Sequence, residues 1–208
     1  MERKNLTIRL ENNADYRNVE NLTRESFWNV YRPGCFEHYV LHCFRNDPAF
    51  VKELDFILEL NGELIGQIIY LRTKIISNNK EIPIMTFGPL SIAPKYKRQG
   101  YGKYLLDYSM DKAKEMGVGA LAITGNILFY GKSGFVVGKE KGIIYQDDPN
   151  ADYFLIKELI PNFLNGVKGT YKDLDGYFIA EKDKKGFSMF EATFPKKEKL
   201  VLPDQLFI

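Results

Sequence analysis

A turn over residues 97–102 combines the residue types that bind a phosphate through the backbone. It reads Lys97-Arg98-Gln99-Gly100-Tyr101-Gly102, and Lys103 follows it. Glycine lets a ligand approach the main chain without meeting a Cβ atom. If a helix begins here, its free N–H groups and dipole favour an anion. The turn therefore predicts a phosphate-binding site, although an ordinary basic turn between a strand and a helix would look similar.

Two familiar phosphate motifs do not fit this turn. A Walker A loop needs Ser or Thr after its Gly-Lys pair, and here Gly102-Lys103 is followed by Tyr104. A dinucleotide fingerprint needs a third glycine, which the segment GYGKYL lacks, and an acidic residue at the end of the next strand. The sequence therefore excludes both of these sites.

The elements around the turn can be read from their hydrophobic periodicity. Alternating Leu90 and Ile92 predict the end of a strand, which Pro94 closes. A helix follows, with an apolar face at residues 101, 104, 105 and 108, basic residues at 112 and 114, and a glycine cap at 117. A short strand is expected over 120–124, before the cluster FYGKSGF at 129–135.

The remaining elements are predicted on both sides of this stretch. We expect a strand over 6–10, a helix from Asn13 or Asp15 to Phe27, and a helix over 36–44. Strands over 55–60, 63–76 and 82–92 follow as antiparallel neighbours, because Asn61-Gly62 is a strong hairpin signal. Beyond residue 135 we expect strands over 136–138, 143–145 and 153–159 and a short helix over 161–164.

These motifs resemble the GNAT superfamily of N-acetyltransferases. That family has a Q/R-x-x-G-x-G/A turn after a strand, then a helix, a strand and an F-Y-x-x-x-G-F segment. Both motifs are present here in the same order, and the one departure is Lys97 in place of Gln or Arg. The segments RPGCFEHYVLH and DYFLIKELIPNFLNGVKGTYK also look similar to the predicted YhbS-like acetyltransferases.

The resemblance implies an α/β GNAT fold with acyl-CoA as the ligand. Its mixed central sheet would be splayed at the fourth strand, with helices on both faces. Gly88-Pro89 suits the splay, since proline cannot donate to a ladder and glycine tolerates a bulge. We expect residues 1–145 to form the acetyltransferase core. Residues 146–208 would add strands and an extension packed on the same domain.

The resemblance also implies which residues hold the cosubstrate, acetyl-CoA. The backbone of residues 98–103 would bind its phosphates. Amides near Leu90 and Ile92 would pair with the pantetheine arm and stabilise the oxyanion. The expected cofactor-binding residues are Leu90, Ser91, Ile92, Lys97, Arg98, Gln99, Gly100, Tyr101, Gly102, Lys103 and Asn126.

Tyr130 aligns with the tyrosine that protonates the leaving thiolate in this family. A phenol with a reference pKa near 10 stays protonated at neutral pH and can donate that proton. The chain contains 13 tyrosines, so a packing role for Tyr130 is the alternative.

The base is harder to identify from the sequence. A lysine-like amine has a pKa of about 10.4, so presenting it neutral at pH 7 costs roughly 4–5 kcal/mol. Many GNAT relatives place a glutamate on the fourth strand, where this chain has Met85-Thr86-Phe87. Glu37, His38 and His42 are the candidate catalytic residues, with solvated helix charges as the alternative. The histidines at i and i+4 share one face, but two of them are too few for a metal site, and no metal is expected.

Composition excludes several classes of protein. The 208 residues carry a net charge of +2, which gives no bulk attraction to nucleic acid. No signal peptide or membrane span is visible, and Cys35 and Cys43 form no disulfide framework. We therefore expect a cytoplasmic protein, with a homodimer as a possible assembly. Cys35 is expected to be a packing residue.

The sequence thus favours an N-acetyltransferase that moves an acetyl group from acetyl-CoA to a primary amine by direct attack in a ternary complex. Two alternatives stay open. One is an acyl-CoA-binding sensor or interaction module of the same fold without turnover, which the missing strand-four glutamate favours. The other is acetylation of a protein or RNA acceptor. Tyr130 favours catalysis.

Overall fold

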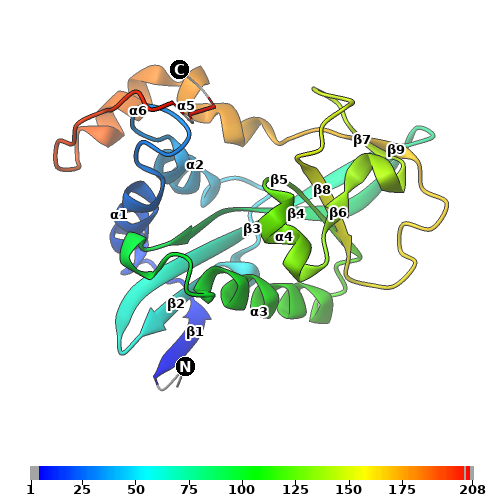
Figure 1. The fold of residues 1–208 in the computed structure, drawn as a ribbon, viewed down its shortest axis with the longest axis horizontal. Coiled ribbons are helices and arrows are strands. Elements are labelled where there is room, and N and C mark those ends of the chain that lie inside the picture. Colours follow the sequence, from blue (N-terminus) through cyan, green and yellow to red (C-terminus); the bar gives the residue numbers. More distant parts are fainter. Residues whose placement is uncertain (1–4, 204, 207–208) are drawn as a thin grey trace.

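The structure, a computed structural model, describes residues 5–203 and 205–206 (Figure 1). Its strands are β1 (Leu6–Leu10), β2 (Phe56–Leu60), β3 (Glu63–Ser77), β4 (Lys80–Ile92), β5 (Ala120–Thr124), β6 (Val136–Val137), β7 (Ile143–Tyr145), β8 (Phe154–Glu158) and β9 (Gly169–Tyr171). Its α-helices are α1 (Tyr16–Phe27), α2 (Glu37–Phe44), α3 (Tyr101–Glu115), α4 (Ile127–Tyr130), α5 (Ile179–Lys182) and α6 (Lys184–Glu191).

The strands form one mixed sheet in the order β1-β2-β3-β4-β5-β8-β6, with β9 joining β3 to β7. Pairing is antiparallel except between β4 and β5 and between β7 and β9, which are parallel. The predicted hairpin is confirmed: Asn61 and Gly62 both have positive φ (54° and 79°), as a type I′ turn between β2 and β3 requires.

Helices cover both faces of the sheet. Alternate strand residues point to opposite sides, and β3 carries apolar residues on each of them. On one face, Leu105 and Leu106 of α3 cluster with Ile68 and Tyr70 of β3. On the other face, α1 and α2 cluster with the intervening residue of β3, Ile69. The predicted fold class, a mixed sheet with helices on both faces, is confirmed.

The sheet opens between β4 and β5, as the sequence predicted. These strands pair at Met85↔Leu121 and Thr86↔Ala122, and β4 then continues to Ile92 without further pairs to β5 among the described residues. On its other side, β4 has a bulge at residues 88–89, because Ile68 pairs with Leu90 while Tyr70 pairs with Phe87. The bulge lies at Gly88-Pro89 and bends β4 where it separates from β5.

Some local predictions are wrong. Asp15 occupies the N-cap position of α1, but its carboxylate accepts hydrogen bonds from Arg9 (2.7 and 2.9 Å) and makes no side-chain cap. Residues 161–164 form turns and no helix, and Leu164 N donates to Glu158 Oε1 (2.6 Å). At both places a partner six residues away in the sequence outweighed the preference of the segment itself.

The C-terminal region is integrated with the core. β8 lies between β5 and β6, and β9 pairs with β3. Helix α6 lies beside α2 and above α1 in Figure 1. There Glu191 accepts hydrogen bonds from Arg24 Nη2 (2.5 Å) and lies 2.8 Å from His38 Nε2. These contacts support our proposal that residues 146–208 fold in one domain with residues 1–145.

Replacing Glu191 with glutamine should destabilise the whole domain. Arg24 is 1% exposed and would remain charged without its carboxylate partner. We expect a loss of about 3 kcal/mol in the free energy of unfolding, at the low end for buried pairs because Glu191 keeps 18% exposure. Burial opposes ionisation of Glu191, but hydrogen bonds from His38 and Arg24 outweigh it and lower its pKa from 4.5 to about 2. This contribution to stability should therefore be lost as the pH falls from 4.5 towards 2.

Urea denaturation followed by circular dichroism measures this effect, with Glu181→Gln as the matched control. Glu181 pairs with Arg32 at 3.2 Å but is 53% exposed, so its loss should cost less than about 1 kcal/mol. Equal effects of the two variants would show that α6 does not anchor the fold.

Candidate active site

The turn over residues 97–102 has the backbone geometry of an anion-binding nest. Arg98 (φ 61°) and Gly100 (φ 86°) are both left-handed, and α3 begins directly afterwards at Tyr101. Alternating backbone conformations of this kind point successive N–H groups into one concavity, to which the N-terminus of α3 adds its free amides. A Cβ on Gly100 would meet nothing within 4 Å, so the backbone angle, and not space, requires glycine.

Three side chains at the turn, those of Lys97, Gln99 and Lys103, are engaged elsewhere, while Arg98 is exposed. Lys97 Nζ donates to the Ser26 carbonyl in the last turn of α1 (2.5 Å), and burial together with Arg98 lowers the Lys97 pKa. Gln99 donates to the Lys95 carbonyl (2.9 Å), and Lys103 pairs with Asp107. Any phosphate bound here would therefore be held by main-chain amides, with Arg98 as the charged side chain of the turn that can reach it. This explains why Lys97 can replace the usual Gln or Arg.

The open part of β4 directs backbone groups away from β3. Ala93 N donates to the Ile65 carbonyl (2.8 Å). In an antiparallel ladder, bonded and non-bonded pairs alternate, so the pairs of Gly66 with Ile92 and of Ile68 with Leu90 are of the non-bonded type. The amides of Leu90 and Ile92 therefore face the opening left by β5.

Ser91 differs from its two neighbours. By the same alternation, its backbone faces β3. Its hydroxyl is buried, 3.2 Å from Thr23 Oγ1 and 3.0 Å from Gln67 Nε2. The polar groups of Ser91 therefore tie β4 to α1 and β3, and they do not line the opening.

The start of α3 lies at this opening too. A Cβ on Gly102 would be 3.5 Å from Ile92 Cγ1 and 3.5 Å from Phe129 Cζ. Gly102 thus lies between the end of β4 and the segment that carries Tyr130. The turn over residues 97–102, the open edge of β4 and the segment around α4 therefore border one another.

Tyr130 is held in place by aromatic packing. Its ring centroid is 5.7 Å from those of Phe87 and Phe135. Burial raises the pKa of its hydroxyl above the ordinary value, and the nearby Tyr31 raises it further. Gly125 is required here, since a Cβ would lie 2.4 Å from the Tyr130 ring. Asn126 caps α4 by accepting from Leu128 N (2.8 Å), and a contact of Asn126 with the cofactor stays a prediction.

The two histidines share one face of α2, as their spacing predicts, and α6 packs against that face, over His38 and beside His42. Both rings pack against Phe190, with centroids 5.4 Å (His38) and 4.5 Å (His42) away. His38 is fully buried, with Nε2 bonded to Glu191 and Nδ1 3.4 Å from Cys35 Sγ. Burial lowers the His38 pKa despite the carboxylate, which favours the neutral ring.

His42 is exposed and lies 2.9 Å from Glu20. Glu37, at the start of α2, accepts a hydrogen bond from the Phe36 amide (2.9 Å), and burial raises its pKa. It also interacts electrostatically with Tyr31, the residue that adjoins Tyr130. Of the three predicted catalytic residues on α2, the structure therefore links Glu37 alone to the surroundings of Tyr130.

Sequence reasoning missed two residues near Tyr130. These are Tyr31, in the loop before α2, and Tyr177, whose hydroxyl lies 3.4 Å from the Gly88 carbonyl and interacts with Tyr130. Nothing in the sequence marks either residue, because they are far from both motifs and belong to no pattern of spacing.

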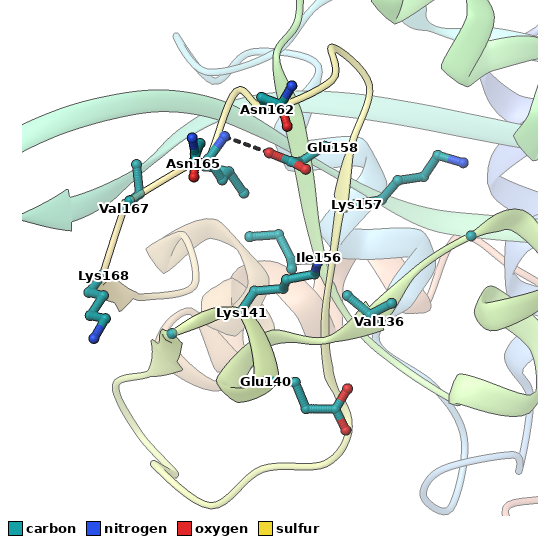
Figure 2. A pocket seen from close by; sticks show the side chains of 14 residues that line it. Val136, Glu140, Lys141, Ile156, Lys157, Glu158, Asn162, Asn165, Val167 and Lys168 are labelled. Atoms are coloured by element: carbon teal, nitrogen blue, oxygen red, sulfur yellow. Dashed lines mark hydrogen bonds between the residues drawn. The ribbon is translucent and has the colours of Figure 1, made fainter.

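Two hollows lie outside this constellation. The larger, about 590 Å³, lies between β8 and the loop over 162–168 and is lined by Lys141, Lys157 and Lys168 beside Glu140 and Glu158 (Figure 2). The smaller, about 510 Å³, lies between α1 and the end of β4, where Ala93, Pro94 and Lys95 lead into the turn. Within the described residues, no group of three or more His, Cys, Asp or Glu side chains is arranged to hold a metal. Nor is any helix among them long and apolar enough to span a membrane.

Comparison with known proteins gives consistent matches. The model of the acetyltransferase (GNAT) family matches residues 15–135. The uncharacterized N-acetyltransferase YhbS of Escherichia coli K12 is 23% identical over 164 residues, which cover 79% of this chain and 93% of YhbS.

Solved structures agree with this result. The crystal structure of the E. coli GNAT family N-acetyltransferase YhbS in complex with CoA matches with a TM-score of 0.72 at 22% identity, over 83% of this chain and 92% of that one. A GNAT family acetyltransferase from Brucella melitensis in complex with acetyl-CoA matches with a TM-score of 0.63 at 18% identity, over 83% of this chain and 97% of the other. These likenesses show the fold.

Changing Gly100 to alanine should weaken binding of acetyl-CoA. Alanine resists φ 86°, so the turn should relax and lose amide contacts to the phosphates. We expect the Kd to rise about tenfold, equivalent to about 1.4 kcal/mol, as measured by titration calorimetry.

Gly117→Ala is the matched control, since Gly117 has φ 83° and also has nothing within 4 Å of its Cβ position. It should cost similar stability and leave the Kd unchanged. If both variants bind acetyl-CoA like the unmodified chain, the turn is not the phosphate site.

Proposed function

This chain belongs to the acetyltransferase (GNAT) family, and from that premise we propose that it transfers an acetyl group from acetyl-CoA to a primary amine by direct attack in a ternary complex. One observation carries the proposal: the nest over residues 98–100, the open edge of β4 and the protonated Tyr130 border a single opening in the sheet. The relatives crystallised with CoA and acetyl-CoA support the identity of the donor.

The opening can bind the phosphates of acetyl-CoA and stabilise the charge that develops on its thioester. The nest and the first amides of α3 bind the diphosphate. The Leu90 and Ile92 amides pair with the pantetheine arm and place a donor next to the thioester oxygen, where negative charge develops as the amine attacks. Since these amides belong to a strand anchored on β3, they need no rearrangement during the reaction.

Tyr130 completes the transfer as the acid. The tetrahedral intermediate collapses when its C–S bond breaks, and the thiolate takes the proton of the Tyr130 hydroxyl. The phenolate then takes a proton from the nitrogen of the product, which restores Tyr130. A raised pKa keeps the phenol protonated until the thiolate forms beside it.

We propose that Glu37 contacts the acceptor and that His38 and His42 do not. His38 is sealed beneath α6, and His42 pairs with Glu20. Glu37 is half-buried and acts electrostatically on Tyr31, which in turn acts on Tyr130. Because the Phe36 amide holds one of its oxygens, Glu37 suits binding of a cationic acceptor better than cycling of a proton.

Tyr130→Phe should lower turnover by about tenfold or more while leaving the affinity for acetyl-CoA unchanged, because it removes the hydroxyl that donates the proton and keeps the ring. Thiol release from acetyl-CoA over a panel of primary amines measures turnover, and calorimetry measures affinity. Gly125→Ala should have a similar effect, since its Cβ would displace the Tyr130 ring.

Gly131→Ala serves as the control for the glycine variant, because the Cβ at residue 131 meets only ordinary contacts, with Ile127 at 3.4 and 3.7 Å. Full turnover in Tyr130→Phe would remove Tyr130 from its role. A chain that binds acetyl-CoA but releases no thiol with any amine would instead be a sensor.

Glu37→Gln should raise the KM for the amine by about three- to tenfold and change kcat little. The variant removes the attraction between the carboxylate and the cationic acceptor, which is equally strong in the bound substrate and in the transition state. His42→Gln, with an exposed side chain on the same helix, should change neither constant. A fall in kcat without a change in KM would argue against a binding role for Glu37.

A further inference from the structure

A buried cluster of hydroxyls and one carboxylate lies against β4 where the sheet opens. Tyr171, on β9, is fully buried, and its strand partners are Ile75 of β3 and Tyr145 of β7. Its hydroxyl makes no hydrogen bond of regular geometry with the described residues. It interacts with Thr86, the last residue of β4 to pair with β5, and with Asp173. A buried hydroxyl held only loosely by its neighbours can turn to a ligand, so its place beside a carboxylate suggests a binding site.

Asp173 follows β9 and is the acidic member of this cluster. Its carboxylate accepts a hydrogen bond from the Tyr145 hydroxyl (2.8 Å). Burial raises its pKa, the hydroxyls of Tyr145 and Tyr171 oppose that effect, and the charge of Asp147 adds to it. The hydroxyls of Tyr153 and Tyr177 also interact with it. A carboxylate whose pKa lies above the ordinary range is a better proton acceptor than a solvated one.

Tyr177 connects this cluster to the reacting centre. Asp173 and Tyr130 both act electrostatically on its hydroxyl and raise its pKa, after burial as the main cause. It also lies 3.4 Å from the carbonyl of Gly88, on the bulge of β4. The Cβ position of Gly88 is 3.9 Å from this hydroxyl and 3.9 Å from Ile123 of β5, so the space beside Gly88 lies within the opening itself.

The position of the cluster explains the missing carboxylate on β4. Residues 85–87 of that strand offer only Met, Thr and Phe. Asp173 reaches the same part of β4 from the C-terminal region and interacts with residues that surround the Thr86 side chain. Neither Glu37 nor the histidines of α2 are among the groups that act on Asp173 or Tyr177.

We propose that Asp173 is the group that receives the proton of the acceptor's ammonium, with the Tyr171 and Tyr177 hydroxyls and the Gly88 carbonyl binding the nitrogen beside it. This inference rests on the proposed acetyl transfer and deepens it. It also assigns the acceptor class: a small cationic primary amine that can enter beside Gly88.

The proton balance is complete. The ammonium passes one proton to the Asp173 carboxylate and becomes a neutral amine, whose lone pair attacks the thioester carbon. The C–S bond breaks, Tyr130 protonates the thiolate, and the phenolate takes the second proton from the nitrogen of the new amide. Asp173 then loses its proton to solvent. One ammonium and acetyl-CoA yield one amide, CoA as the thiol and one proton.

The test compares Asp173→Asn with Asp175→Asn, which makes the same change two residues away. Asp175 is 78% exposed and pairs with Lys182, so its variant should behave like the unmodified chain. In Asp173→Asn, kcat/KM for a primary amine at neutral pH should fall about 100-fold, as expected when a general base is lost. The Kd for acetyl-CoA should not change.

The pH profile separates a proton acceptor from a structural residue. Without Asp173, only amine that is already neutral can react, so kcat/KM should rise about tenfold per pH unit up to the pKa of the amine. The unmodified chain should show a flat region instead, ending on the acid side where Asp173 becomes protonated. Tyr145→Phe keeps the carboxylate but removes a hydrogen bond that lowers its pKa, and it should therefore move that acid limb to higher pH.

A readout without turnover completes the experiment. Calorimetry of the amine binding to the protein–CoA complex should show weaker binding in Asp173→Asn than in Asp175→Asn. Urea denaturation checks that both variants are folded, and if Asp173→Asn is not, the shifted limb of Tyr145→Phe is the deciding result.

The inference is overturned if Asp173→Asn keeps the rate and the flat profile of Asp175→Asn, or if Tyr145→Phe leaves the acid limb in place. Either result would leave the proposed acetyl transfer unaffected. If the unmodified chain binds acetyl-CoA but releases no thiol with any amine, the proposed function fails and this inference fails with it.

Discussion

The site depends on the early end of the hydrogen-bonded pairing between β4 and β5. β4 pairs with β5 through two residue pairs and then runs on alone to Ile92. Backbone amides inside a protein need partners, and two adjacent parallel strands would normally supply them to each other. Here the bulge at residues 88–89 turns β4 aside while β3 holds its other edge in register. The amides that remain at the opening are therefore fixed in direction and free to bind a ligand.

The other parts of the site are arranged around this opening. The turn after β4 places left-handed residues and the start of α3 at one end of it. Tyr130 approaches from a short helix that packs on Phe87 of β4 itself. Tyr177 reaches the Gly88 carbonyl from the C-terminal region. Because each of these contacts is made to β4, a shift of that strand would disturb the donor and the acceptor sides together.

The C-terminal region has two distinct roles. Its last helix packs against the face of α2 that carries His38 and His42, and Glu191 neutralises the buried Arg24 there. The segment before it, from β9 to Tyr177, contributes hydroxyls and a carboxylate to the neighbourhood of Thr86. His38, which looks catalytic in the sequence, is thus part of the packing, and Asp173, which looks unremarkable there, shares a cluster with the hydroxyls of Tyr145 and Tyr171.

Features that depend on a few neighbouring residues could be predicted from the sequence, and features that depend on other parts of the chain could not. Hairpin geometry at Asn61-Gly62, the helix over residues 101–115, the bulge at Gly88-Pro89 and the phosphate turn follow from backbone preferences of a few neighbouring residues, and these were predictable. The missing side-chain cap of α1 and the turns at 161–164 depend on Arg9 and Glu158, each six residues from its partner and outside the pattern used to predict the element. The burial of His38 depends on Glu191, which is 153 residues away and meets it only after folding. The sequence by itself determined that the chain has a phosphate turn and a tyrosine motif on an α/β scaffold. Only the tertiary structure decided which acidic and basic side chains share that opening, because burial and pKa are properties of neighbours that lie far apart along the chain.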